Sequence, residues 1–176
     1  IEEGFYVWRN LYSRQIINNL RFDENILFTE DIIFCVDITE LVEKAVFIDV
    51  EYYNYFIDNN TSLTKSRYNE KTFCTIEANL YLQSKINILF PNDKLLKHIA
   101  RKRLLNNAIY HYYQIHYNRS YKLDTDYTFR KKLKVLINKN FRWSFKPSVL
   151  IICSRFLNVT LFRYFFGIHN NFSNKL

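Results

Sequence analysis

The chain has 176 residues, of which 18% are aromatic, and it contains only two glycines and two prolines. So few glycines exclude a P-loop and a dinucleotide-binding fingerprint, which both need several glycines close together. Three cysteines that lie far apart exclude a disulfide framework and are typical of a reducing, cytosolic compartment.

The charge is divided unevenly along the chain, whose net charge is +8. Residues 1–93 carry 15 acids and 8 bases, whereas residues 94–176 carry 2 acids and 17 bases. This asymmetry predicts that the second half faces an anionic membrane surface, a nucleic acid or an acidic surface of the same protein. No helix-turn-helix, zinc-finger or RNA-recognition signature supports nucleic acid, so the membrane surface is favoured.

Three elements are predicted in the first third of the chain. Apolar residues at three- and four-residue spacing predict a helix over residues 5–19. Thr29 is expected to cap a second helix, with Glu30 and Asp31 in the first turn, where the helix dipole favours carboxylates. Residues 45–57 are rich in Val, Ile, Tyr and Phe, and this composition predicts a strand. The apolar residues expected to face inward from the second helix are Ile32, Ile33, Val36 and Leu41.

The remainder of the chain predicts helices only, over residues 68–90, 92–117 and about 125–140. A last apolar segment, residues 148–168, is interrupted by two arginines, which are costly inside a bilayer. We expect that segment to lie at a membrane surface or to be an ordinary buried helix. The change of character predicts a boundary between residues 65 and 66.

Several short motifs follow one another in the first third of the chain. They are Trp8, Leu11 and Tyr12; Arg21 and Phe22; Glu30, Asp31 and Phe34; Tyr53 and Tyr55; Ser62 and Thr64. In their order and spacing these motifs resemble the second half of the catalytic domain of family 2 glycosyltransferases, which are inverting enzymes with the GT-A fold. Two positions depart from the family pattern, since Asn10 stands where Lys is usual and Phe56 where Arg commonly follows the Tyr.

The resemblance implies a fold class and a division into two domains. Residues 1–65 would be an α/β fragment, the C-terminal half of a GT-A domain, and residues 66–176 an all-α basic extension near a membrane. The family's donor-binding half, with its D-x-D motif for Mg or Mn, would lie upstream of this chain. Asp124-Thr125-Asp126 also reads D-x-D, but it follows the catalytic segment and is expected to begin a helix.

The resemblance also implies roles for individual residues. Asp31 would be the general base that accepts the proton of the acceptor hydroxyl. The residues that would contact the acceptor or substrate are Glu30, Trp8, Tyr53, Tyr55 and Ser62. The enzyme would transfer a sugar from a nucleotide-sugar donor to a glycan or lipid-linked acceptor, and would be cytoplasmic and peripheral at the membrane.

Each of these residues also has a simpler interpretation. Glu30 and Asp31 would only begin a helix, Trp8 and the tyrosines would only pack in a core, and Ser62 would only cap a helix. The four histidines show no metal-ligand spacing and are expected to be packed or exposed residues. The alternative function is therefore a non-enzymatic basic helical module that binds an anionic membrane or nucleic acid.

Overall fold

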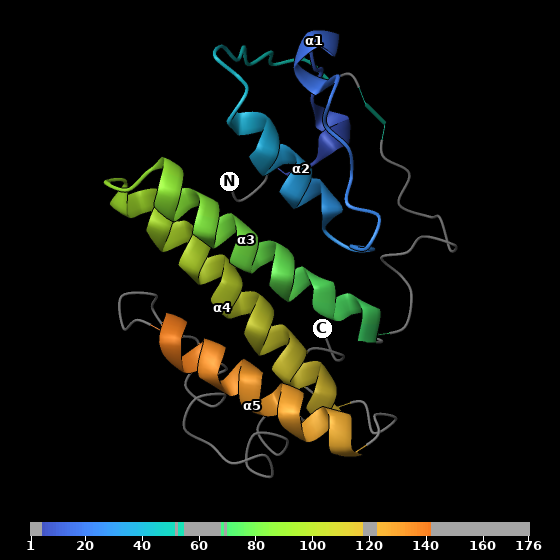
Figure 1. Ribbon diagram of the computed structural model, residues 1–176, viewed down its shortest axis with the longest axis vertical. Coiled ribbons are helices and arrows are strands. Elements are labelled where there is room, and N and C mark those ends of the chain that lie inside the picture. The colour runs from blue at the N-terminus through green and yellow to red at the C-terminus, as the bar shows by residue number, and fades with distance from the viewer. Residues whose placement is uncertain (1–4, 52, 55–67, 69, 118–122, 142–176) are drawn as a thin grey trace, which may run out of the picture. The chain divides into compact units, whose positions relative to one another are not determined.

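The described part of the chain is helical. A computed structural model describes residues 5–51, 53, 54, 68, 70–117 and 123–141, and in these residues helices alternate with irregular segments and no strand occurs. The chain divides into two compact units, Ile1–Asp93 and Lys94–Leu176. Figure 1 shows the helices of each unit. The predicted boundary between residues 65 and 66 lies outside the described residues.

The predicted α/β fragment is wrong, because the segment expected to be a strand forms none in its described residues. Residues 45–51 run as irregular chain, with Val46 75% and Phe47 90% exposed. A high content of β-branched and aromatic residues favours a strand only where a neighbouring strand supplies hydrogen bonds and a packed face. No described segment supplies that neighbour, so the composition alone does not produce a strand.

In its described residues the N-terminal unit contains five short or medium helical elements. They are η1 (Val7–Arg9), α1 (Arg14–Ile17), α2 (Glu30–Thr39), η3 (Glu70–Phe73) and α3 (Cys74–Leu89). The single helix predicted over residues 5–19 is therefore wrong. Asn10 is extended, at φ −121° and ψ 145°, and its side-chain amide donates to the Tyr6 carbonyl at 2.9 Å. This local hydrogen bond offers the backbone an alternative to a helix, which ends after Arg9.

Helix α2 packs against α3. Ile32 and Val36 are buried as predicted, whereas Leu41 lies beyond the end of α2 and is 49% exposed. The other buried residues of α2 are Phe34, Cys35 and Ile38, and those of α3 are Ile76, Ala78, Asn79, Leu82 and Ile86. The helix predicted over residues 68–90 is confirmed by η3 and α3.

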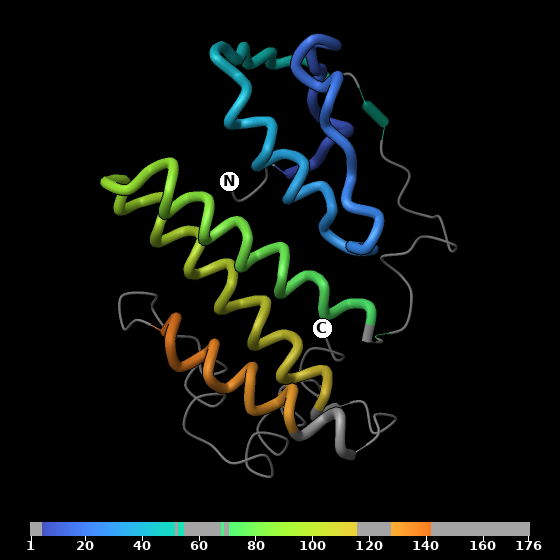
Figure 2. Tube along the Cα trace, in the orientation of Figure 1, coloured from blue at the N-terminus to red at the C-terminus, as the bar shows by residue number. Residues whose placement is uncertain are grey.

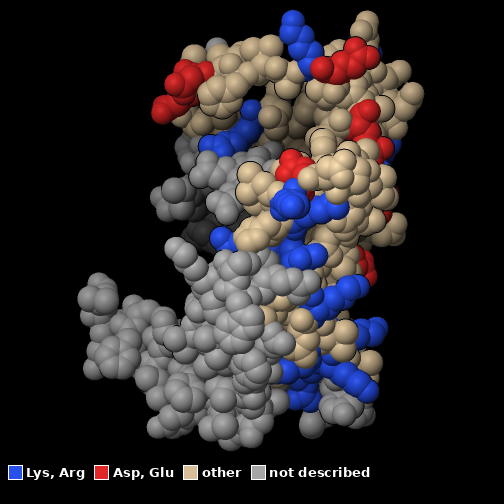
Figure 3. Space-filling model, turned by 90° about the vertical axis from the view of Figure 1, so that its left-hand side faces the viewer, with Lys and Arg blue, Asp and Glu red and all other residues tan. Residues whose placement is uncertain are grey.

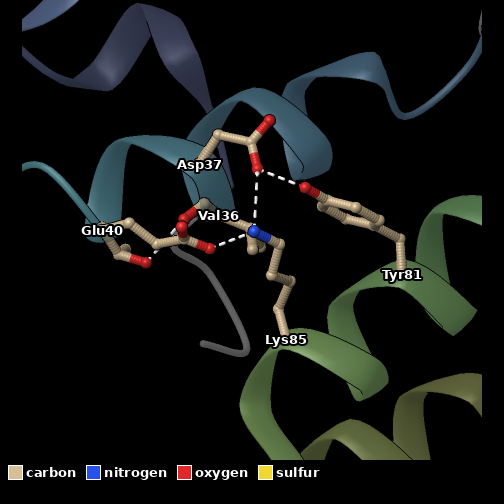
Figure 4. Close-up of polar contacts among 6 residues, drawn as sticks. Val36, Asp37, Glu40, Tyr81 and Lys85 are labelled. Carbon is tan, nitrogen blue, oxygen red and sulfur yellow. Dashed lines mark hydrogen bonds and ion pairs between the residues drawn. The ribbon is translucent and has the colours of Figure 1, made fainter. Parts of the chain in front are cut away.

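Polar contacts also fix α2 to α3 (Figure 4). The Tyr81 hydroxyl donates to Asp37 Oδ1 at 2.5 Å. Lys85 Nζ donates to Glu40 Oε1 and lies 3.9 Å from Asp37 Oδ1. The hydrogen bond to Glu40 raises the pKa of Lys85, which therefore stays charged at neutral pH. This set of four residues, which we call the α2–α3 clamp, fixes the register between the two helices.

The part of the C-terminal unit that the structure describes is a pair of helices, α4 (Lys94–Tyr117) and α5 (Leu123–Asn140), which pack against each other. They run antiparallel, as Figures 1 and 2 show. Both helices confirm the predictions made for residues 92–117 and 125–140. The buried residues are Ala100, Leu104, Leu105, Ala108, Ile109, His111, Tyr112 and Ile115 on α4, then Leu133, Ile137, Asn140 and Phe141.

The predicted segment 148–168 lies outside the described residues. Among the helices that are described, none combines the length and the apolar character needed to cross a membrane.

Candidate active site at the start of α2

The start of α2 is set by an unusual backbone conformation. Thr29 has φ 64° and ψ 22°, a left-handed conformation, and it is the one described residue other than glycine with positive φ. For a β-branched residue this conformation costs about 1–3 kcal/mol, and such strain concentrates at functional sites. Thr29 stands at the N-cap position as predicted, but its hydroxyl donates to the Phe28 carbonyl at 2.5 Å and caps no helix amide.

Glu30 and Asp31 occupy the first turn of α2, as the sequence predicts. Both side chains are partly exposed. The positive end of the helix dipole favours ionised carboxylates at these positions. A partly exposed carboxylate that is held by a helix terminus has the position and the charge that a general base requires.

Tyr12 and Cys35 lie close to Asp31. The Tyr12 hydroxyl is 3.8 Å from the Cys35 Sγ atom. Burial, with smaller contributions from Cys35 and from the negative charge of Asp31, raises the pKa of Tyr12 to about 12. Burial also raises the pKa of the Cys35 thiol, and Asp31 adds to this shift. Both groups are therefore neutral at physiological pH, and neither competes with Asp31 as a base.

Aromatic contacts hold the preceding loop against α2. Phe34 of α2 is buried, and its ring stacks on Phe22 with the centroids 4.4 Å apart and the planes inclined by 13°. The Tyr12 ring meets the same Phe34 edge-on, at 6.0 Å and 85°. Because both partners come from the chain before α2, these contacts fix the environment of Asp31 from the N-terminal side.

Three exposed rings form a second feature, which we call the aromatic platform: Tyr6, Trp8 and Tyr53. Trp8 stacks on Tyr53, with ring centroids 4.5 Å apart and planes inclined by 30°, and Tyr6 lies 5.3 Å from Trp8. The three rings are 45%, 41% and 54% exposed in the order given. The Arg9 guanidinium lies 5.7 Å from the ring centroids of both Tyr6 and Trp8, within the range of a cation–π contact. The platform therefore offers aromatic surface and a positive charge to solvent.

The structure brings together part of the residue set predicted from the sequence. Trp8 and Tyr53, 45 positions apart, are in direct contact. The platform residue Trp8 belongs to η1, and η1 lies against α2, which carries Glu30 and Asp31. Tyr55 and Ser62 lie outside the described residues.

The sequence analysis missed Tyr6, a member of the platform, and Arg9, the cation beside it. The available signal was their spacing in Tyr6-x-Trp8-Arg9, which places the three side chains around one tight helical turn. The α2–α3 clamp was also missed, since it joins residues 44 to 48 positions apart.

The resemblance assigns the expected divalent metal mainly to residues upstream of this chain, so that expectation is not tested by the described part of the chain. No group of three or more His, Cys, Asp or Glu residues comes together there. Asp124 and Asp126 belong to the first turn of α5, as predicted for a helix start.

The chain was compared with protein-family models, with curated proteins and with solved structures, and none of the three comparisons gave a match. A functional assignment therefore depends on the geometry at α2 and on the motifs in the sequence.

Proposed function

We propose that the N-terminal unit supplies the general base and the acceptor-binding surface of an inverting glycosyltransferase. One observation carries the proposal: the helix that presents Asp31 in its first turn lies against the turn that presents the exposed ring of Trp8. A carboxylate near exposed, stacked aromatic rings is a common way to hold and deprotonate a sugar. The resemblance to family 2 glycosyltransferases assigns the same residues.

Asp31 would act directly on the acceptor hydroxyl. As the acceptor oxygen bonds to the anomeric carbon of the donor sugar, its proton passes to an oxygen of the Asp31 carboxylate. The bond between the anomeric carbon and the diphosphate oxygen breaks at the same time, and its electron pair leaves with the nucleoside diphosphate. Because attack and departure are in line, the anomeric configuration is inverted. Such a positioned base contributes about 10²–10⁴-fold in rate.

The aromatic platform would orient the acceptor. The C–H faces of a sugar ring pack well against indole and phenol rings, while hydroxyls at the edge remain free for hydrogen bonds. Trp8 and Tyr53 would supply this surface, and Glu30 would accept a hydrogen bond from an acceptor hydroxyl. The resemblance adds Tyr55 and Ser62 to the acceptor-binding residues.

The donor would be bound elsewhere in the enzyme. The resemblance assigns the nucleotide sugar and its Mg or Mn ion to residues upstream of this chain, and the proposal retains that assignment. With a glycan or lipid-linked acceptor, the enzyme would work at the cytoplasmic face of a membrane. The competing proposal, a basic module without catalytic activity, would leave Glu30 and Asp31 with only a structural role at the start of α2.

An acceptor-dependence assay separates the two proposals. The natural full-length protein would be incubated with a panel of nucleotide sugars and Mg²⁺ or Mn²⁺, with and without a mixture of glycan and lipid-linked acceptors. A glycosyltransferase releases nucleoside diphosphate faster with its acceptor, and NMR of the product should show an inverted anomeric configuration. Retention of configuration, or no release with any donor and acceptor, would contradict the proposal.

A further inference from the structure

Every charged residue among the described side chains of the C-terminal unit is basic. Residues 94–115 and 128–141 contain ten bases and no acid, and the two acids of residues 94–176 are Asp124 and Asp126. The ten bases are Lys94, Lys97, Arg101, Lys102, Arg103, Arg130, Lys131, Lys132, Lys134 and Lys139. Figure 3 shows blue side chains gathered over the surface that α4 and α5 form. So many like charges repel one another, and an anionic partner would relieve this repulsion.

On α5 the bases divide between two faces. Lys131, Lys132 and Lys139 are exposed, and they lie four and three residues before and four residues after the exposed Val135. Residues at these spacings share one face of a helix. We call these four residues the α5 outer face. Leu133 and Ile137, which are fully buried, mark the opposite face, where α5 packs on α4.

Lys134 belongs to the packed side. Its Nζ atom lies 5.5 Å from the ring centroid of Tyr112 on α4, and partial burial lowers its pKa. The two kinds of lysine therefore have different roles: Lys134 covers the junction between the helices, and the α5 outer face presents its three ammonium groups to solvent.

The antiparallel packing adds bases from α4 to the same end of the pair. The bases of α4 lie in its first ten residues, 94–103, and those of α5 lie in residues 130–139, within its last eleven residues. Since the two helices run in opposite directions, the start of α4 and the end of α5 both point away from the connection between the helices (Figure 2). Positive charge is thus concentrated toward that end of the unit.

We propose that the α5 outer face docks on an anionic lipid surface. The exposed apolar residues near the lysines favour a lipid surface over other anionic partners. Val135, at their centre, is 58% exposed, and Leu95, in the first turn of α4 next to Lys94, is 67% exposed. Apolar side chains among lysines suit the boundary between lipid headgroups and acyl chains. Nucleic-acid recognition relies more on arginine, which none of the residues of the α5 outer face supplies.

This proposal does not depend on the transfer chemistry, so the two can fail separately. Each lysine close to an anionic leaflet should strengthen binding about fivefold, and three together on the order of a hundredfold. The attraction falls with salt, because the screening length shortens from about 10 Å at 0.1 M to about 3 Å at 1 M.

The test is co-sedimentation of the full chain with vesicles of phosphatidylcholine containing about one-third phosphatidylserine, chosen to give a strongly anionic surface. The variant Lys131→Gln/Lys132→Gln/Lys139→Gln should bind about a hundredfold more weakly. The matched control, Arg14→Gln/Lys44→Gln/Lys71→Gln, removes the same charge from exposed positions of the N-terminal unit and should bind like the parent. Circular dichroism and thermal melting check that both variants keep the fold, as expected for substitutions at exposed positions.

Three results would overturn the proposal. Equal weakening by the two triple variants would mean that net charge, and not the α5 outer face, determines binding. Equal binding of the parent to pure phosphatidylcholine vesicles would remove the anionic lipid from the argument. Displacement of the protein from vesicles by a single-stranded or duplex oligonucleotide at a lower concentration than by soluble phosphoserine headgroups would identify a nucleic-acid surface instead.

Discussion

Trp8 illustrates at the scale of single residues how the proposed site should respond to change. Its ring is 41% exposed and stacks on Tyr53, so it is not a buried core residue, and the proposed function assigns it to contact with the acceptor. Trp8→Ala should raise the KM for the acceptor roughly 2- to 13-fold, because a lost aromatic contact costs about 0.5–1.5 kcal/mol. The value of kcat should change little, since Trp8 touches no reacting atom in the proposed chemistry.

Trp8→Phe provides the matched control and should recover most of the affinity, because it retains a flat ring. Steady-state kinetics with varied acceptor measures both variants. A fall in kcat with an unchanged KM would show that Trp8 does not bind the acceptor.

At the same scale, the residue types of the candidate site were predictable from the sequence. The contacts between these residues were not. The carboxylate pair at the start of α2 follows from Thr29-Glu30-Asp31, because helix starts favour these residue types. The positive φ of Thr29 carries no such signal, since a β-branched residue is disfavoured there. The stack of Trp8 on Tyr53 depends on chain folding between positions 45 residues apart, which local patterns do not encode.

The α2–α3 clamp is the relevant structure at the scale of helical elements. Tyr81→Phe removes the hydrogen bond to Asp37 while keeping the ring, and should lower the free energy of unfolding by about 1 kcal/mol. In an Asp37→Ala background the same substitution should cost little, because the acceptor is already gone. A double-mutant cycle from urea unfolding measures the coupling. Equal costs in both backgrounds would show that this contact does not join the helices.

The segment expected to be a strand supports a second prediction at this scale. Phe47 is 90% exposed, so Phe47→Ser should change the free energy of unfolding by less than about 0.5 kcal/mol and should raise solubility. Thermal melting and sedimentation check both effects. A loss of about 3 kcal/mol or more, as expected for a buried phenylalanine, would mean that the segment packs against something.

Elements with long periodic patterns were the predictable ones. The predicted limits of the helices that became α4 and α5 hold to within two residues, because apolar residues recur on one face over four turns or more. The helix predicted over residues 5–19 failed, since the Asn10 side chain bonds to the backbone and interrupts it. The strand failed because strand formation requires a partner that composition does not reveal.

At the scale of the whole molecule, one buried residue of the C-terminal unit should make stability depend on pH. His111 is fully buried, and burial lowers its pKa from 6.5 to about 4. The unfolded chain therefore binds a proton between pH 6.5 and pH 4 that the folded chain does not. Stability should be complete above pH 6.5 and should fall, by on the order of 3 kcal/mol, as the pH drops to 4.

Urea unfolding monitored at a series of pH values measures this loss. His111→Phe should reduce the slope between pH 4 and pH 6.5, whereas His98→Gln, on the same helix but only partly buried, should keep it. An unchanged slope in His111→Phe would mean that other groups cause the acid sensitivity.

Replacement of Asp31 tests the central claim most directly. If the full-length protein is the proposed glycosyltransferase, Asp31→Asn should lower the rate of sugar transfer about 10²–10⁴-fold, because the amide cannot accept the acceptor proton, while donor binding measured by calorimetry stays the same. Asp37→Asn is the matched control: it changes a carboxylate of the same helix within the α2–α3 clamp and should leave transfer near the parent rate. Transfer by Asp31→Asn at the parent rate, or equal losses in the two variants, would contradict the account.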